Sequence, residues 1–433
     1  MPEPSRRSQL IPFSPIRTMF RLADEMERAG GGPVFRLHVG DPDFAPPDVV
    51  VEETGAAMRS GKTHYAPVAG VQRLREALAE KVRRKNGVAA DAEQIIVCPG
   101  STQALFATMQ ILFSPGEEIL IPEIYWPNYV QQALLAAGRP VFYPLQEGYQ
   151  PDLDGTRRLI TPRARAIMLC SPSNPTGAVF PEPTLRALWD LAREKNLWIL
   201  SDEAYEDFVF RGSHVSPGSF ERELPEAERC VFSLFTFSKT YAMTGFRLGY
   251  IAAPTRMSAI LLRKAQEPLI GSASMPIQWG ALNALGEQAS VERMRETYRR
   301  RRDLALSVLK PAGLADYTPE GAFYILADVS RTGLDGDAFA QRLLEEERVA
   351  VAPGAGFALQ PTVGKDNFPV GEMTPAGAPE YATNPKAKHR VRIAFCVSDE
   401  ELREGLTRLV RFAERAAAGQ ATAGARVSPG APR

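Results

Sequence analysis

The stretch "FTFSKTYAMTGFRLGY" at Phe235–Tyr250 places one lysine, Lys239, among residues typical of a buried strand followed by a tight turn. An ammonium group is costly to bury unless a partner neutralises it or it loses its proton. Arg247 follows in the same stretch, after a glycine. Lys239 is therefore either an ordinary surface residue or a residue kept for chemistry, and the rest of the sequence is needed to choose.

Short apolar runs alternate with amphipathic stretches of helix length between residues 95 and 255. The runs are "QIIVC", "EEILIP", "PVFYPL", "AIMLC", "LWILSDE", "VFSLF" and "LGYIAA". Near-continuous apolar strands with helical crossovers predict an α/β fold, in which helices flank a mainly parallel sheet. Ligands of such sheets bind beyond the carboxyl ends of the strands.

The pattern changes after residue 255 to long helices, two strands ("GAFYILADV" and "HRVRIAFCV") and a closing helix from Asp399 to about Ala418. These elements predict a second, smaller α+β domain. We expect an N-terminal segment at 1–47 that joins the small domain, a large domain at 48–300, the small domain at 301–418 and a disordered tail at 419–433.

Residues 360–389 show little periodicity and lead into the strand "HRVRIAF". Segments of this length without secondary structure are usually either functional or disordered. One hypothesis is a lid or wall beside a substrate pocket, and the alternative is a disordered surface insertion.

Composition excludes several classes of protein. Lys+Arg and Asp+Glu number 51 each, so no overall charge attracts the chain to nucleic acid or to an anionic membrane. We expect no secretory leader and no membrane span, because no apolar run approaches the ~20 residues of a spanning helix. The four cysteines lie beside apolar strand residues without a CxxC pair, which favours a cytoplasmic protein. The four histidines are scattered, so we expect no metal site.

Polar residues follow three of the predicted strands. In "VCPGSTQAL", Ser101 and Thr102 begin a helix, whose N-terminus can bind an anion, although helix capping explains both residues equally well. "CSPSNPTGAVF" places Asn174 in a turn, and "LWILSDEAYEDF" ends a strand with Asp202, shortly before Tyr205. A carboxylate there needs a cation or donors, unless it is simply a helix N-cap.

The motifs "SPSNPTG", "SDEAY", "SK" with "GFRLGY", and "VRIAF" occur in an order and spacing that resemble the class I/II aminotransferases of pyridoxal-phosphate fold type I. "YAPVAGVQRLREALA" and "GDPDF" are similar to that family too, and the resemblance covers about residues 30 to 415. It implies a fold type I transferase with pyridoxal 5'-phosphate as its cofactor.

The resemblance also implies roles around the cofactor ring. Lys239 would join the cofactor aldehyde as a Schiff base and later move the proton between the substrate Cα and the cofactor C4′, which requires a lowered pKa. Asp202 would pair with the pyridinium nitrogen, and Tyr205 and Asn174 would hydrogen-bond the ring oxygen. Trp126 would stack on the ring, unless it is a core or rim tryptophan.

The cofactor phosphate would be held by Ser101, Thr102, Thr236, Ser238 and Arg247. The family usually has a serine where Thr236 stands, and the threonine keeps the hydroxyl group.

Arg392 would bind the substrate α-carboxylate together with Gly40 and Asn174, and Arg390 on the same strand is the rival. Tyr65 resembles the tyrosine that reaches the phosphate of the neighbouring subunit, which implies a homodimer with shared active sites.

The implied reaction is ping-pong transfer of the α-amino group of an L-amino acid, of aspartate or aromatic type, to a 2-oxo acid through pyridoxamine phosphate. The alternative is a related enzyme with another outcome: a β-lyase, synthase, decarboxylase or amino-acid oxidase. A transcription regulator built on this domain is not expected, since about 30 residues precede "FRLHVGDPDF" and the net charge is zero. The sequence does not identify the donor.

Overall fold

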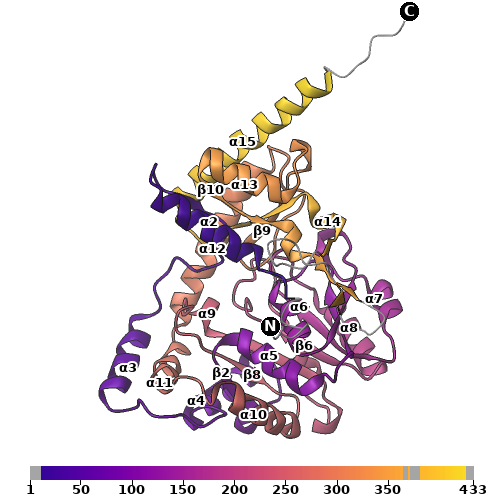
Figure 1. Ribbon diagram of the computed structural model, residues 1–433. Helices are drawn as coiled ribbons and strands as arrows, with labels where there is room; N and C mark the ends of the chain where they lie inside the picture. Colours follow the sequence, from indigo (N-terminus) through magenta and orange to yellow (C-terminus); the bar gives the residue numbers. More distant parts are fainter. Residues whose placement is uncertain (1–10, 364–368, 371–380, 426–433) are drawn as a thin grey trace, which may run out of the picture.

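The computed structural model describes residues 11–363, 369–370 and 381–425. Figure 1 shows a large domain around a central sheet and a smaller group of elements stacked on one side of it. The C-terminal end of the last helix, α15, projects away from both.

The large domain is built on a seven-stranded sheet with the order β2-β8-β7-β6-β5-β3-β4. Strand β8 is antiparallel to β2 and to β7, and the other neighbouring pairs are parallel. The prediction of a mainly parallel sheet is confirmed, and all seven apolar runs form its strands. Their bounds are β2 (Ile95–Cys98), β3 (Glu118–Pro122), β4 (Arg139–Tyr143), β5 (Ala164–Cys170), β6 (Trp198–Asp202), β7 (Val231–Thr236) and β8 (Gly249–Ala252).

Helices cover both faces of this sheet (Figure 1), which is why its strands are apolar on both sides. Helices α5, α6 and α10 share one core with the sheet, and α8 shares another. The helices of the large domain are α3 (Asp48–Arg59), α4 (Gln72–Lys85), α5 (Gly100–Leu112), α6 (Asn128–Leu135), α7 (Leu153–Leu159), α8 (Glu182–Glu194), α9 (Phe237–Thr240), α10 (Arg256–Ile270) and α11 (Met275–Ala284).

The small domain has an antiparallel sheet in the order β11-β16-β9, and β1 pairs in parallel with β10. Met19 and Leu37 share one core with Leu343 and Leu406, and this packing supports placing the N-terminal segment in the small domain. The expected border at residue 300 falls inside the continuous helix α12. The elements are α2 (Pro15–Arg28), β1 (Phe35–Arg36), α12 (Gln288–Leu309), β9 (Tyr324–Asp328), α13 (Gly336–Glu347), β10 (Val349–Ala350), β11 (Ala352–Pro353), β16 (Arg390–Ala394) and α15 (Asp399–Ala425).

Two expectations about irregular segments need correction. Helix α15 continues to Ala425, so the disordered tail predicted from residue 419 is wrong for 419–425, where alanine favours the helix. Residues 426–433 lie outside the described chain. The described parts of 360–389 form short antiparallel pairs and a helical turn: β12 (Leu359–Gln360) with β15 (Ala382–Thr383), β13 (Thr362–Val363) with β14 (Pro369–Val370), and α14 (Pro385–Lys388). Strands of two residues are too short to produce a periodic pattern.

Within the described residues, no helix combines the length and the apolar character needed to cross a bilayer.

Candidate active site

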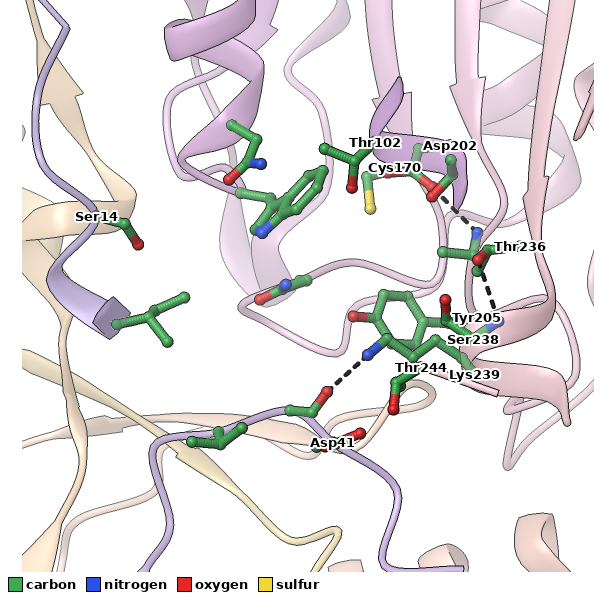
Figure 2. A pocket seen from close by; sticks show the side chains of 18 of the residues that line it. Ser14, Asp41, Thr102, Cys170, Asp202, Tyr205, Thr236, Ser238, Lys239 and Thr244 are labelled. Carbon is green, nitrogen blue, oxygen red and sulfur yellow. Dashed lines mark hydrogen bonds between the residues drawn. The ribbon is translucent and has the colours of Figure 1, made fainter. Parts of the chain in front are cut away.

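A cavity of about 790 Å³ lies at the carboxyl edge of the large sheet, where the small domain meets it (Figure 2). Side chains from both domains line the cavity. All the predicted site residues except Tyr65 are among them: Gly40, Ser101, Thr102, Trp126, Asn174, Asp202, Tyr205, Thr236, Ser238, Lys239, Arg247 and Arg392.

Lys239 is held by the short helix α9 directly after β7. The Thr236 hydroxyl caps this helix by accepting the backbone N–H of Ser238 at 3.1 Å. Lys239 Nζ donates to the carbonyl oxygen of Gly40 at 2.6 Å, as Figure 2 shows. Burial lowers the pKa of Lys239 to about 8, so a larger share of its amine is neutral near physiological pH than in an ordinary lysine. The Lys239 amine therefore gives up its proton more readily than the amine of an exposed lysine.

Asp202 ends β6 and is buried. Its Oδ2 accepts a hydrogen bond from the Tyr129 hydroxyl at 2.7 Å, and its Oδ1 accepts one from the backbone N–H of Ala204 at 3.1 Å. Burial raises the pKa of Asp202 to about 6, because these two donors are neutral and compensate the charge only in part. A turn follows β6 and no helix begins there, so the alternative of a helix N-cap is wrong.

Arg392 on β16 is a guanidinium whose side chain is only 1% exposed. Its Nη1 donates to Asn174 Oδ1 at 2.9 Å and its Nη2 to the carbonyl oxygen of His38 at 2.5 Å. Its Nε is buried without a partner in the described chain. The known partners are uncharged oxygens, so this buried cation still lacks an anion.

Arg390, the rival of Arg392, is already neutralised. Its guanidinium lies 2.8 Å from Asp316 and 3.1 Å from Asp328. It does not line the cavity. Two residues on one strand thus have different electrostatic surroundings, because their neighbours come from different parts of the chain.

Ser101 and Thr102 lie in the first turn of α5, where free backbone N–H groups favour an anion. Arg247 Nη1 donates to Ser238 Oγ at 3.4 Å and to the carbonyl oxygen of Thr244 at 2.9 Å, which are uncharged acceptors. A helix N-terminus, several hydroxyls and a guanidinium therefore line the same end of the cavity.

Sequence reasoning missed two tyrosines of this cavity. Tyr129, the partner of Asp202, follows Trp126 by three residues and packs edge-on against it, with ring centroids 5.5 Å apart. That spacing was a signal in the sequence. The Tyr324 hydroxyl lies 2.9 Å from that of Tyr205, and its strand "GAFYIL" gave no sign of this contact.

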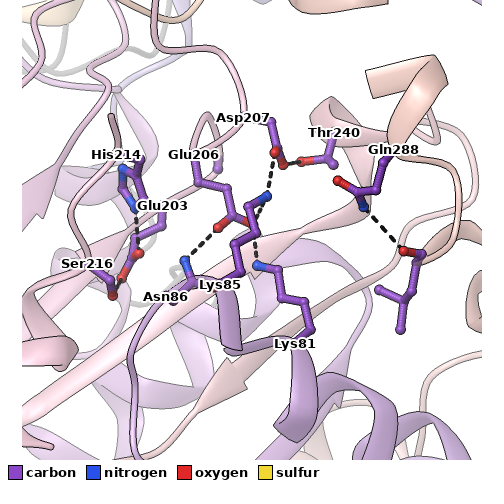
Figure 3. Close-up of polar contacts among 12 residues, drawn as sticks. Lys81, Lys85, Asn86, Glu203, Glu206, Asp207, His214, Ser216, Thr240 and Gln288 are labelled. Carbon is purple, nitrogen blue, oxygen red and sulfur yellow. Dashed lines mark hydrogen bonds and ion pairs between the residues drawn. The ribbon is translucent and has the colours of Figure 1, made fainter. Parts of the chain in front are cut away.

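A network of charged and polar side chains fixes the turn that follows Asp202 (Figure 3). Burial would raise the pKa of Glu206, but the Lys81 and Lys85 ammonium groups outweigh it and hold that pKa below its usual range. Asp207 pairs with Lys85 and accepts the Thr240 hydroxyl at 2.9 Å. Since Thr240 follows Lys239 in α9, the network ties α9 to the turn after Asp202.

Two predicted features lie away from the cavity. The Tyr65 side chain is 93% exposed and does not line the cavity. No described residue of 360–389 lines the cavity. Residues 364–368 and 371–380 lie outside the described chain, and the lid or wall stays a hypothesis.

Comparison with known proteins agrees with this fold and site. The family model "Aminotransferase class I and II" matches residues 32–409. The chain belongs to this family, and it is an aminotransferase.

Named relatives are similar over most of the chain. The aspartate/prephenate aminotransferase of Thermus thermophilus is 38% identical over 95% of this chain and 99% of its own length. The aromatic-amino-acid aminotransferase 2 of Thermococcus litoralis is 37% identical over 82% of this chain and 90% of its own length. The solved structure of the Thermus thermophilus aspartate aminotransferase with maleate superposes with a TM-score of 0.84, at 37% identity, over 95% of this chain and all of that one.

The pKa of Asp202 predicts a pH-dependent stability. The folded chain holds the carboxyl proton more tightly than the unfolded chain, whose ordinary pKa is 3.8, so the resulting stabilisation is full below about pH 4 and is lost as the pH rises through about 6. Without a bound ligand, Asp202→Asn should therefore stabilise the protein above pH 7, by on the order of 3 kcal/mol, relative to wild type.

Urea unfolding of the ligand-free protein at pH 4.5 and 8 measures this difference. Asp303→Asn, at an exposed position on α12, is the control. It retains Asp202, so the difference between its stability and that of wild type should not change between the two pH values. A wild type that is more stable than Asp202→Asn at pH 8 would contradict the argument.

Proposed function

We propose that the enzyme uses pyridoxal 5'-phosphate to transfer the α-amino group of an L-amino acid to a 2-oxo acid. One observation carries this proposal: a lysine of lowered pKa, a buried carboxyl group, an anion site and a buried arginine without an anion line one cavity. The cofactor, when bound, supplies an aldehyde for the amino group and a ring that accepts electrons.

The residues present fit this cofactor. The first turn of α5, with the Ser101, Thr102, Thr236, Ser238 and Arg247 side chains, offers the N–H groups, hydroxyls and cation that a phosphate requires. Asp202 offers the buried carboxylate that a pyridinium N–H would pair with, which would remove the cost of its charge.

Glycines keep the anion site open. A Cβ on Gly100, whose φ is +81°, would lie 2.7 Å from Arg247 Nη2. A Cβ on Gly249 would lie 2.7 Å from the backbone nitrogen of Ser101. Both positions therefore need glycine if the guanidinium and the start of α5 are to approach each other.

The chain's own groups would then do the following. Arg392, with Asn174, binds the substrate α-carboxylate and thereby orients the Cα–H bond. Lys239 Nζ takes the proton from Cα, which its lowered pKa permits. Tyr205 donates a hydrogen bond toward the cofactor ring oxygen, and Trp126 covers the ring.

We propose a donor of aspartate or aromatic type, as the names of the relatives suggest. The alternative outcomes, β-lyase, synthase, decarboxylase or oxidase, are not favoured, because the relatives described above are named as aminotransferases. We also propose a cytoplasmic enzyme, since the cysteines are free thiols.

The first test is a product balance. Purified enzyme with pyridoxal 5'-phosphate, an L-amino acid and 2-oxoglutarate should form glutamate and the new 2-oxo acid in equal amounts. Lys239→Ala should lose this activity by at least about 10³-fold, because Cα then has no base. Release of ammonia, carbon dioxide or hydrogen peroxide in place of glutamate would move the assignment to one of the alternative reactions.

Arg247→Ala should weaken cofactor binding roughly 10–100-fold, because a charge-assisted contact with the phosphate is worth about 1.5–3 kcal/mol. Titration of the cofactor-free protein with pyridoxal 5'-phosphate, followed by absorbance, measures the dissociation constant. Arg295→Ala on the exposed face of α12 serves as the control. An unchanged affinity in Arg247→Ala would refute the phosphate assignment.

We propose a homodimer in which Tyr65 reaches the phosphate of the partner subunit. Tyr65 is almost fully exposed in one chain, and α3 and α10 also present uncovered apolar side chains, such as Met58 at 56% and Met257 at 64% exposed. Large exposed apolar residues are typical of surfaces that another chain covers.

Sedimentation should therefore give a dimer. Tyr65→Ala and Lys239→Ala subunits, each weakly active or inactive alone, should regain activity when they are unfolded, mixed and refolded together. The hybrid then has one site with an intact Lys239 and an intact tyrosine from the partner. A fully active monomer would contradict the proposal.

A further inference from the structure

Arg17 on α2 is a cavity-lining cation to which the proposed reaction gives no role. Among the residues that the structure describes, four basic side chains line the cavity: Arg17, Lys239, Arg247 and Arg392. The proposed reaction uses Lys239 as the reacting amine, Arg247 to bind the cofactor phosphate and Arg392 to bind the substrate α-carboxylate. Arg17 remains, and no ion pair or side-chain hydrogen bond joins it to any residue in 11–363, 369–370 or 381–425.

The carboxylates near Arg17 in the sequence belong to other arginines. Glu25 pairs with Arg21 at 2.7 Å. Asp24 and Glu27 both pair with Arg36, at 2.5 and 2.7 Å. The acidic side chains of α2 are thus occupied one or more turns further along the helix, and Arg17 is left facing the cavity without one.

The position of Arg17 is also unfavourable for the helix itself. It lies in the first turn of α2, near the positive end of the helix dipole, and no acidic residue shares that turn. Arg21 follows at i+4, and like charges at that spacing repel. Local helix stability does not explain an arginine here, whereas an anion bound in the cavity would.

The start of α2 lines the cavity on the side opposite Lys239, where the distal end of a substrate side chain would lie. In Figure 2, Ser14 at the start of α2 lies across the cavity from Lys239 and Ser238. A substrate with its Cα at Lys239 must point its side chain into the remaining space. Ile16 and Phe20 line the cavity beside Arg17, whose side chain is exposed and so can turn toward a carboxylate in the cavity.

We propose that Arg17 binds the distal carboxylate of a dicarboxylic amino acid or 2-oxo acid whose α-carboxylate is bound by Arg392. Arg17 would then be the residue that selects acidic side chains over neutral ones. This inference rests on the proposed aminotransferase reaction and goes further by naming the substrate class and the residue that recognises it.

The opposite specificity has a weaker basis. Asp41 lines the same cavity and could receive a basic side chain. It directly follows Gly40, whose carbonyl oxygen binds Lys239, and Figure 2 shows it on the Lys239 side of the cavity. Its charge therefore acts near the reacting amine, where it opposes the lowering of the Lys239 pKa, and not at the α2 end.

The test compares donors of nearly equal shape. Aspartate and asparagine differ in charge at the distal group, so the ratio of their kcat/KM values reports the recognition of that charge. Wild type should prefer aspartate, and Arg17→Gln should lower the ratio about 10–100-fold, as expected for one lost charge-assisted contact. Arg17→Lys should keep part of the preference. Arg21→Gln, one turn later on α2, is the matched control and should leave the ratio within about twofold of wild type.

A binding measurement separates this inference from the proposed reaction. Maleate has two carboxylates and no amino group, and crotonate is its monocarboxylate counterpart. With the cofactor-loaded protein, calorimetry should show that Arg17→Gln weakens maleate about 10–100-fold and leaves crotonate unchanged. This readout does not depend on turnover. Absence of transamination with any donor would overturn the proposed reaction, even if maleate binding still depended on Arg17.

Three results would overturn the role of Arg17. One is an equal loss of activity with aspartate and asparagine in Arg17→Gln, which would indicate a structural role. Another is wild-type maleate binding in that variant. The third is a wild-type preference for arginine as donor that Arg17→Gln does not alter and Asp41→Asn removes.

Discussion

The carboxyl ends of β5, β6 and β7 lie side by side, and the charged groups placed there and beside them have no full set of partners within the described chain. Strand pairing aligns Cys170 with Asp202, and Asp202 with Leu234, so the residues that follow each strand meet at one edge. Burial then shifts pKa values in opposite directions: it raises that of Asp202 and lowers that of Lys239. Both shifts follow from the cost of holding a charge away from water. The cavity thus holds ionisable groups whose charges the surrounding side chains compensate only in part.

Both domains contribute groups to this cavity. Arg392 comes from the small-domain sheet, and its Nη1 bonds Asn174, which follows β5 in the large domain. The carbonyl oxygen of Gly40, in the segment that enters the large domain, accepts a hydrogen bond from the Lys239 amine. A Cβ on Gly40 would lie 1.9 Å from the Tyr324 hydroxyl, so only glycine lets the backbone at position 40 lie this close to Tyr324. The relative placement of the domains is therefore part of the chemistry, because a shift between them would change the contacts of both Arg392 and Lys239.

Much of the fold was accessible from sequence, because strands buried on both faces leave near-continuous apolar runs. The polar residues that end those runs were accessible for the same reason: Asp202 and Asn174 stand out against their apolar surroundings. The hydrogen bond between Tyr205 and Tyr324 was not accessible, since Tyr324 belongs to a strand of the other domain and an aromatic residue in a strand is ordinary. The short β12–β15 pairing left no periodic signal, and the end of α15 was misplaced because helix propensity in an alanine-rich tail outweighed its few glycines.

The sequence by itself determined the type of sheet, the edge at which polar residues gather and the residue types found there, because these follow from periodicity and from the order of motifs along the chain. It left Arg390 and Arg392 as rivals, since residues two apart on a strand share the same pattern. Tertiary structure decided which of the two is neutralised: Asp316 and Asp328 pair with Arg390, whereas the described partners of Arg392 are uncharged oxygens. The position of Arg17 in the cavity was likewise decided by the packing of α2. Whether a charged side chain is neutralised depends on residues that are distant in the sequence and that folding brings beside it. The local sequence therefore cannot predict its ion pairs.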